Sequence, residues 1–291
     1  RQYADAGADV LTTNTFNANF NKLSRFGLGD KVRDINIAAV RLARENGPGL
    51  LVAGSVGPIG EIDVGAGIDD GRVVAILTEQ IQALADGGAD FIIFESLANS
   101  RDTSYAVQAV AEVEIPYMLS FSLDRSGESA TGESLDALMK VVDDIKGRKP
   151  TALGINCGEG PESTLSALEI FIRKVGYPVI VQPNAGVPKK VDNRMIYMTS
   201  PEYFTTYCLR YVNLGARGVG GCCGISPAHI ADMARSIKPL AKSEYKPELT
   251  VQIKEEEMME PIPTAAKSEL GRKLAAGEWI TTIEITPPRG F

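Results

Sequence analysis

The sequence predicts an α/β protein built as a (β/α)8 TIM barrel that lacks its first strand, and three observations indicate this fold. First, seven short apolar runs are spread over residues 1–240, with helical segments between them. Second, three of these runs follow a helix that ends at glycine, as in DGGADFIIFES from Asp86. Third, the runs are too continuously apolar for a strand with one solvated face, which is typical of parallel strands buried on both faces.

The seven apolar runs are the expected strands, in chain order. The glycine ahead of a run suits the left-handed position that ends a helix. The runs are DAGADVLTTNTF from Asp5, LLVAGSV from Leu50, DGGADFIIFES from Asp86, PYMLSFSL from Pro116, TALGINC from Thr151, PVIVQPN from Pro178 and NLGARGVGGCC from Asn213. A TIM barrel has eight strands and this sequence opens inside a helical segment, so we expect the first strand to lie outside the chain. An open doubly wound sheet is the alternative architecture.

Helical periodicity is clearest in the second half of the sequence. Two of the predicted helices begin at a serine followed by proline, a good N-cap and first-turn pair, at Ser200 and at Ser226. Apolar residues then recur at helical spacing. The three predicted stripes are Phe204, Tyr207, Cys208 and Tyr211; Ile230, Met233, Ala234 and Ile237; and Leu165, Leu168, Ile172 and Val175, the last in a helix ending at Gly176.

The pattern divides the chain into three parts. Residues 1–240 are the predicted barrel, and residues 241–265 are a predicted linker, with an acidic run at Glu255–Glu257 and three prolines. Residues 266–291 resume with an amphipathic helix, a stop at Gly277 and an alternating strand. We expect a second α/β domain to begin there.

Composition excludes several classes of protein. The net charge is −7 and no cluster of Lys and Arg forms a stripe, which argues against nucleic acid and against an anionic membrane surface. Four cysteines are too few for a disulfide framework, and no apolar run is long enough to span a bilayer. The first residues lack the features of a signal peptide. We therefore expect a cytoplasmic protein whose partners are small molecules.

The chemistry of a TIM barrel lies at the carboxyl ends of its strands, which limits the candidate residues. Three of the four cysteines fall there, whereas Cys208 lies in a helix stripe and is expected to be a small buried apolar residue. The candidates are Asn14, Thr15, Ser55, Glu95, Ser120, Asn156, Cys157, Asn184, Cys222 and Cys223.

Cys157, Cys222 and Cys223 predict a metal site. Three thiolates at one point in a reducing compartment need a cation, and zinc with three protein ligands keeps a fourth position open for catalysis. Zinc in such a site would deprotonate an incoming thiol, which favours alkyl transfer to a thiol substrate. Two alternatives stay open, namely small cysteines that pack without metal and a strained disulfide between the adjacent pair.

Three motifs then carry a resemblance to a known family. NCGEGPE from Asn156, QPNAG from Gln182 and GGCCGISPAHI from Gly220 resemble the homocysteine S-methyltransferase family, over about residues 1–240. That family includes betaine-homocysteine methyltransferase and the homocysteine-binding module of cobalamin-dependent methionine synthase. The resemblance implies that zinc is held by the three cysteines and that homocysteine sulfur takes the open position.

The resemblance also implies substrate-binding roles. Glu95 matches the family's acidic residue that holds the homocysteine amino group, and Asn184 matches an asparagine close to the metal that could take its fourth position before substrate binds. Asn14 and Thr15 fit the family's strand-end motif, where backbone placement or substrate contact are both possible. The chain has no counterpart of the family's Asp-Gly motif, which ends the first strand and helps to bind the amine.

The end of the sequence resembles a different protein. TTIEITPPRGF looks like the opening strand of methylenetetrahydrofolate reductase, with Glu284 as its strand-borne glutamate. The resemblance implies the front part of a bifunctional homocysteine S-methyltransferase/5,10-methylenetetrahydrofolate reductase. FAD is expected only if the reductase domain is present in full.

The leading hypothesis is zinc-dependent transfer of a methyl group to homocysteine to give methionine. The alternatives are a non-catalytic zinc- or thiol-binding module fused to a folate reductase, and a zinc-free protein with buried thiols. The methyl donor is left open, and a methylcobalamin- or methylfolate-supplying domain is a possible partner. His229, the only histidine, is expected in a helix's first turn, partly facing solvent, and not as a ligand.

Overall fold

The computed structural model describes residues 1–60, 69–242, 266 and 268–277. The chain divides into two compact units, residues 1–249 and 250–291. In the second unit the described residues form helix α11 (Glu269–Ala275). Most of the predicted linker and the strand with Glu284 lie outside the described residues, so the predicted domain boundaries and the reductase resemblance stay predictions.

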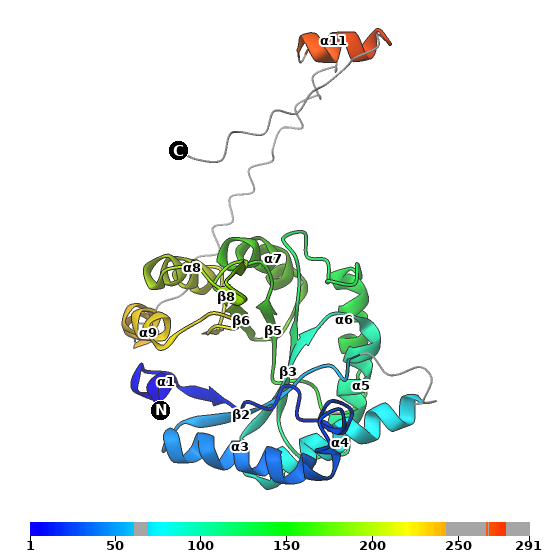
Figure 1. Ribbon diagram of the computed structural model, residues 1–291, viewed down its shortest axis with the longest axis vertical. Helices are drawn as coiled ribbons and strands as arrows, with labels where there is room; N and C mark the ends of the chain where they lie inside the picture. The colour runs from blue at the N-terminus through cyan, green and yellow to red at the C-terminus, as the bar shows by residue number, and fades with distance from the viewer. Residues whose placement is uncertain (61–68, 243–265, 267, 278–291) are drawn as a thin grey trace. The chain divides into compact units, whose positions relative to one another are not determined.

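The core of the first unit is one curled sheet of seven parallel strands, with helices around its outside (Figure 1). The strands follow one another in chain order, which confirms the predicted barrel short of one strand. The doubly wound alternative is wrong, because such a sheet reverses its strand order partway. The strands are β1 (Val10–Thr12), β2 (Leu51–Val56), β3 (Phe91–Leu97), β4 (Tyr117–Phe121), β5 (Ala152–Cys157), β6 (Val179–Pro183) and β9 (Gly218–Val219).

The helices cover the outer face of this sheet. Several begin at a side-chain cap that accepts a backbone N–H, such as Asp69 from Arg72 at 2.7 Å and Ser200 from Tyr203 at 3.3 Å. The helices are α1 (Gln2–Asp5), α2 (Phe20–Ser24), a 3₁₀ turn (Gly29–Lys31), α3 (Val32–Asn46), α4 (Asp70–Asp86), α5 (Ser100–Ala111), α6 (Leu135–Asp143), α7 (Pro161–Lys174), α8 (Pro201–Asn213) and α9 (Pro227–Lys242).

All three predicted helix stripes are confirmed by α7, α8 and α9. Cys208 is fully buried on α8, as expected. Helix α7 ends at Lys174, slightly before the predicted stop, because Val175 already has an extended backbone. No helix among the described residues is long and apolar enough to cross a membrane.

Strand residues alternate between the barrel interior and the helical layer. Ala53, Ile93, Met118 and Ala152 come from four successive strands and form one buried apolar cluster inside the sheet. Their chain neighbours, such as Val52 and Ile92, belong to the large cluster under the helices. Both faces are therefore buried, which explains the continuous apolar runs of the sequence.

The two edge strands, β1 and β9, do not pair with each other within the described residues. Helix α1 lies near this gap, and the hydroxyl of Tyr3 donates to the carbonyl of Ile225 at 2.8 Å. A cavity of about 1050 Å³ occupies the barrel interior and is lined in part by both edge strands. Its lining includes Val10 and Met118 and extends up to Cys222.

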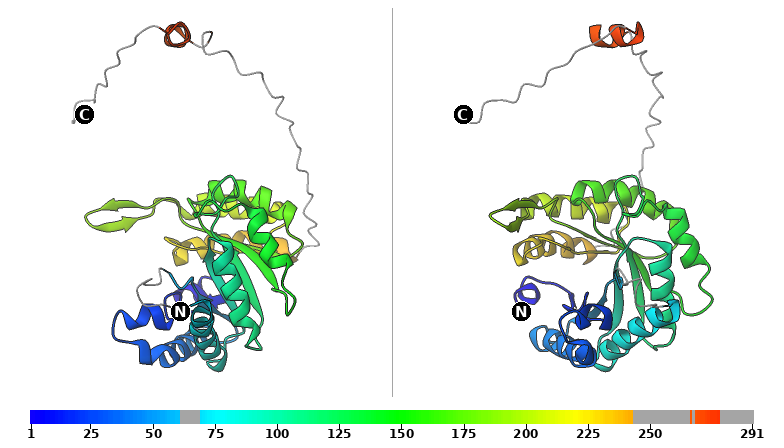
Figure 2. Two further views of the ribbon diagram at one scale, coloured as in Figure 1. Left: turned by 90° about the vertical axis from the view of Figure 1, so that its right-hand side faces the viewer. Right: turned by 45° about the vertical axis from the view of Figure 1, so that its right-hand side comes forward.

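A β-hairpin that sequence analysis did not predict leaves the body between β6 and α8. Its strands are β7 (Lys189–Val191) and β8 (Arg194–Ile196), and it projects from the body in Figure 2 (left). Asp192 and Asn193 have φ values of 45° and 60°. Two such left-handed residues make the turn that matches the twist of a two-residue hairpin.

Candidate functional site

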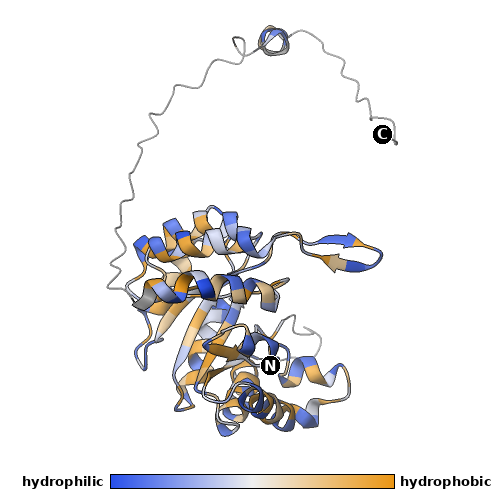
Figure 3. Ribbon diagram, turned by 90° about the vertical axis from the view of Figure 1, so that its left-hand side faces the viewer, coloured by the Kyte–Doolittle hydropathy of each residue, from blue (hydrophilic) through white to orange (hydrophobic). Residues whose placement is uncertain are grey.

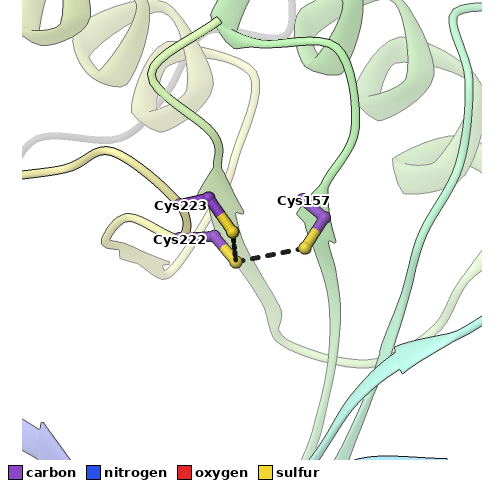
Figure 4. A group of neighbouring side chains, drawn as sticks. All are labelled: Cys157, Cys222 and Cys223. Carbon is purple, nitrogen blue, oxygen red and sulfur yellow. Dashed lines mark hydrogen bonds between the residues drawn. The ribbon is translucent and has the colours of Figure 1, made fainter. Parts of the chain in front are cut away.

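Three of the four cysteines converge at the carboxyl ends of the strands, as predicted (Figure 4). The Sγ atom of Cys222 lies 3.1 Å from that of Cys157 and 3.9 Å from that of Cys223, and all three sulfurs lie within 4.8 Å of one another. Cys157 ends β5, whereas the other two follow β9. In the sheet, only β6 lies between β5 and β9. Cys157 and Cys222 are therefore in contact although they are 65 positions apart in the sequence.

The backbone around Cys157 is strained. Its φ is 63°, in the left-handed region that a residue with a side chain rarely adopts. The backbone N–H of Asn184 donates to the carbonyl of Cys157 at 3.1 Å and helps to hold this conformation. Strain of this kind costs on the order of 1–3 kcal/mol and persists where the surroundings fix it, often at functional sites.

The turn that carries Cys222 and Cys223 is tied to β6 by its backbone. The N–H of Cys222 donates to Pro183 at 2.9 Å, and the carbonyl of Cys223 accepts from Ala185 at 2.8 Å. Gly224 follows with φ of 80°, and a Cβ there would lie 2.2 Å from the ring of Tyr197. Only glycine fits this position, and this explains the glycine beside the cysteine pair.

Asn184 links the two cysteine-bearing loops. Its Nδ2 donates to the carbonyl of Gly158 at 2.8 Å, and its Oδ1 accepts from the backbone N–H of Cys223 at 3.0 Å. Oδ1, the atom that could bind a metal, is thus engaged by backbone. This geometry favours a role in positioning the two loops over the predicted contact with substrate or metal.

Ser96, which sequence analysis missed, supports Cys157 from β3. Its Oγ lies 3.4 Å from the sulfur of Cys157 and accepts from Nδ2 of Asn156 at 3.0 Å. Oδ1 of Asn156 in turn accepts from the backbone N–H of Ser96 at 2.9 Å. Ser96 has φ of 58° where the pairing of β3 with β4 is irregular. The only sequence signal was its place directly after Glu95.

The hydrogen bond between the two closest thiols shifts their titration. It lowers the pKa of Cys157 to about 6, although burial opposes this, and the hydroxyl of Ser96 helps to lower it. The same bond and burial raise the pKa of Cys222. The pair therefore holds a single proton over a wide pH range, with the negative charge on Cys157. Burial alone raises the pKa of Cys208, which keeps that thiol protonated and unreactive.

Glu95 lies at the same mouth. It follows Ile93 by two positions in β3, so its side chain points into the barrel. Burial raises the pKa of this carboxyl, and a hydrogen bond with Ser55 partly offsets the effect. Its charge also raises the pKa of Cys157 and Cys222, which places the carboxylate within electrostatic reach of the thiols. None of the described residues forms an ion pair with it.

The two remaining predicted site residues differ in their surroundings. Thr15 is buried, and its hydroxyl donates to the carbonyl of Ser55 at 2.7 Å and lies 2.7 Å from that of Thr13. This bonding supports backbone placement for Thr15. Asn14 is exposed just beyond β1.

His229 lies in the first turn of α9, as predicted, but the expected solvent exposure is wrong. The residue is 7% exposed, and its ring packs edge-on against Phe204. Nδ1 accepts from the N–H of Ser226 at 3.2 Å, and Nε2 lies 3.0 Å from the carbonyl of Thr199. Both ring nitrogens are engaged, so the histidine fixes the start of α9 and is no candidate ligand.

The three thiols fit a zinc ion. Sulfurs bound to one tetrahedral zinc at about 2.3 Å stand about 3.8 Å apart, and the 3.1 and 3.9 Å separations lie on either side of this value. Thiolate sulfur is also a donor that zinc prefers. Cys223 is exposed and the other two are partly so, and the cluster is therefore accessible from outside.

The sequence model of the homocysteine S-methyltransferase family matches residues 1–237, so the chain belongs to this family. Two relatives are methionine synthases. That of Mycobacterium tuberculosis is 27% identical over 268 residues, which cover 86% of this chain and 22% of the relative. That of Mycobacterium leprae is 29% identical over 252 residues, covering 81% and 21%. The chain thus spans about a fifth of the length of these relatives.

Among solved structures, a homocysteine methyltransferase is also similar to this chain. The homocysteine methyltransferase MmuM from Escherichia coli superposes in its metallated form with a TM-score of 0.67 and 26% identity. The match covers 81% of this chain and 82% of MmuM. The oxidised form of MmuM superposes equally well, with the same TM-score and identity.

Proposed function

We propose that this protein transfers a methyl group to the thiol of homocysteine, giving methionine, and that the transfer depends on zinc held by Cys157, Cys222 and Cys223. The observation that carries the proposal is the convergence of these three sulfurs within 4.8 Å at the carboxyl ends of the strands. Membership of the homocysteine S-methyltransferase family supplies the substrate class.

Zinc, when bound, would supply an open position that stabilises the substrate sulfur as a thiolate at neutral pH. Neighbouring residues of the chain hold the cysteines that would bind the zinc. Ser96 and Asn156 approach Cys157, and Asn184 holds the turn with Cys223 against the loop after β5. The substrate thiol gives its proton to water, and its sulfur lone pair forms the new C–S bond. The electron pair of the broken bond to the methyl group stays with the donor.

Glu95 is the proposed site for the substrate's ammonium group. A half-buried carboxylate without an ion pair among the described residues is costly, and a cation beside it removes that cost. The carboxylate of Glu95 and the three thiols lie at the same end of the barrel, so one bound homocysteine could contact both. Asn184 is proposed to position the loops, and Asn14 is left as an exposed candidate for contact with substrate.

The methyl donor and its carrier are proposed by class only. The curated relatives are methionine synthases of which this chain covers about a fifth, and this favours a donor held by another protein domain. A methylcobalamin- or methylfolate-supplying domain fits that description.

The test compares two cysteine substitutions in the full chain. Cys222→Ala should lose the single zinc ion and all methionine formation with a panel of methyl donors, because two thiolates bind zinc far more weakly than three. Cys208→Ala is the matched control, since this cysteine is buried away from the cluster, and it should keep zinc and turnover. Full zinc content in Cys222→Ala would refute the metal site. Retained zinc without turnover in the unmodified chain would instead favour the non-catalytic module.

A further inference from the structure

The β7–β8 hairpin is exposed along its whole length. Every residue from Lys189 to Ile196 is exposed, and the hairpin stands clear of the body in Figure 3. Five of the thirteen exposed large apolar side chains in the described part of the chain lie on it or at its base. They are Val187, Val191, Met195, Ile196 and Met198.

Strand pairing gives the hairpin two distinct faces. Lys189 lies opposite Ile196, and Val191 lies opposite Arg194. Directly opposed side chains share a face, and alternate residues of a strand do too. One face therefore carries Lys189, Val191, Arg194 and Ile196, and we call it the docking face. The other face carries a single pair, Lys190 opposite Met195.

A hairpin of this kind is poorly stabilised by itself. An isolated two-stranded hairpin is marginal in water unless a hydrophobic face packs on something. Within the described residues nothing buries either face. The docking face alternates cations with apolar side chains, and it is therefore complementary to an apolar patch surrounded by carboxylates.

The base of the hairpin lies at the cysteine cluster. Tyr197 directly follows β8, its ring fills the space that a side chain at Gly224 would take, and its hydroxyl contacts the sulfur of Cys223. Two residues later, the carbonyl of Thr199 lies 3.0 Å from Nε2 of His229. A macromolecule that binds the hairpin therefore lies at the mouth of the proposed active site.

We propose that the docking face binds the protein that delivers the methyl group, through an acidic surface with an apolar centre. The inference rests on the proposed function and names the partner of that same site. Three cations stand on the hairpin against one carboxylate, Asp192, in a chain of net charge −7, so the hairpin differs in charge from the rest of the chain.

A second copy of this chain fits the docking face less well. A symmetric contact between two hairpins would set cations against cations. A permanent partner of any kind would also cover the mouth through which homocysteine must enter. A hairpin of this size suits the small interfaces typical of transient encounters, as delivery of a methyl group requires.

The first measurement is binding. The probe is the methionine synthase of Mycobacterium tuberculosis from which the fifth that aligns with this chain has been deleted, loaded with methylcobalamin. The full chain should bind it with an affinity that falls as salt rises. The double variant K189E/R194E should bind at least about tenfold more weakly, mainly through a slower association rate. K190E is the matched control on the other face and should change binding less than about twofold.

The second measurement is methionine formation from the same probe and from free methylcobalamin. K189E/R194E should lower turnover at least about tenfold with the protein-bound donor and leave turnover with the free donor unchanged. V191S/I196S should act in the same way without changing charge. Circular dichroism and zinc content should match the unmodified chain in all variants.

The outcomes separate this inference from the proposed function. No binding of the probe by the unmodified chain, an equal effect of K190E, or equal losses with free and bound donor would each overturn the docking role. Binding that follows the docking face without any methionine formation would support the docking role and refute the proposed reaction. Self-association of the full chain that K189E/R194E abolishes would assign the docking face to a second copy and overturn the inference.

Discussion

The side-chain oxygen of Asn184 accepts a hydrogen bond from the backbone N–H of Cys223 at 3.0 Å, while its Nδ2 donates to Gly158 at 2.8 Å. One amide thus connects the loop after β5 with the turn after β9, which are the two segments that carry the thiols. We therefore expect Asn184 to influence metal affinity by positioning these two segments.

The first prediction concerns this amide. Asn184→Ala should weaken zinc binding by about 10–100-fold, the range typical of residues that orient metal ligands, whereas the cysteine variants should lose zinc altogether. Competition with a chromophoric chelator measures the affinity. Asn46→Ala also removes an amide bonded to a carbonyl, but far from the site, and should leave zinc binding unchanged. A loss of zinc as complete as in Cys222→Ala would instead make Asn184 a ligand.

The second prediction concerns the stability of the metal-free protein against pH. The pKa of Cys157 is lowered to about 6 and that of Cys222 is raised, against about 8.5 for an unfolded thiol. Between these values the folded pair has lost a proton that the unfolded chain keeps, so stability rises with pH. Above about 8.5 the unfolded chain loses both protons while the folded pair keeps one, so stability falls again.

Urea unfolding of the zinc-free protein at several pH values measures this dependence. Cys157→Ser removes the shared proton but leaves Cys222 buried, so the difference in unfolding free energy between the two proteins should rise from about pH 6 to about 8.5, the pKa of an unfolded thiol, and level off above it. Other titrating groups, such as Cys208, are common to both proteins and cancel in the difference. A difference that stays flat from pH 5.5 to 9.5 would mean that the two thiols do not share a proton.

Much of the fold could be predicted because burial on both faces leaves a signal in the sequence. The strands around Ile93 and Leu119 are continuous apolar runs in the sequence. Each packs against helices on its outer face and against the interior of the barrel on its inner face. The three cysteines could be placed together for the same reason, since parallel strands in chain order bring their carboxyl ends to one side of the barrel.

The parts that could not be predicted depend on backbone angles and tertiary contacts. Ser96 reaches Cys157 only because its φ is 58°, and a strand pattern does not encode that change of direction. The β7–β8 hairpin packs on nothing among the described residues, so Lys189 and Val191 carry no periodic signal. His229 is buried by Phe204 and Thr199, from segments distant in sequence.

The third prediction separates function from stability at Glu95. Its carboxyl has a raised pKa because of burial, so the charged form destabilises the folded protein as pH rises through that pKa. Glu95→Gln should therefore keep or raise the melting temperature at pH 7. It should raise the KM for homocysteine at least about tenfold, because a charged hydrogen bond to the ammonium group is lost, while zinc content stays unchanged.

Glu159→Gln is the control for that substitution. Glu159 is exposed and pairs with Arg125 at 3.9 Å, so its loss should change neither KM nor melting temperature appreciably. An unchanged KM in Glu95→Gln would remove Glu95 from substrate binding. A fall in melting temperature would show that the carboxylate has a partner in the free protein.

The fourth prediction tests the contact between Gly224 and Tyr197. A Cβ at Gly224 would lie 2.2 Å from Cγ of Tyr197, at a φ of 80°. Gly224→Ala should therefore cost more than the strain of a left-handed alanine, which is about 1–2 kcal/mol, and should displace the cysteine turn and weaken zinc binding. Gly132 has the same φ of 80° with nothing within 4 Å of its Cβ position. Gly132→Ala thus measures the backbone strain alone.

A double-mutant cycle with Tyr197→Gly isolates the steric part of the cost, because the Cβ of Tyr197 also lies 2.6 Å from the Cβ position at Gly224 and an alanine at 197 would keep that clash. In the absence of the ring, Gly224→Ala should cost about as much unfolding free energy as Gly132→Ala, and the coupling should lie within the range of about 0.5–3 kcal/mol seen for residues in contact. Zinc affinity should recover in the double variant, because the cysteine turn can return to its place. Additive costs would mean that the ring of Tyr197 moves freely away from Gly224, and then the base of the hairpin would not be fixed against the cysteine cluster.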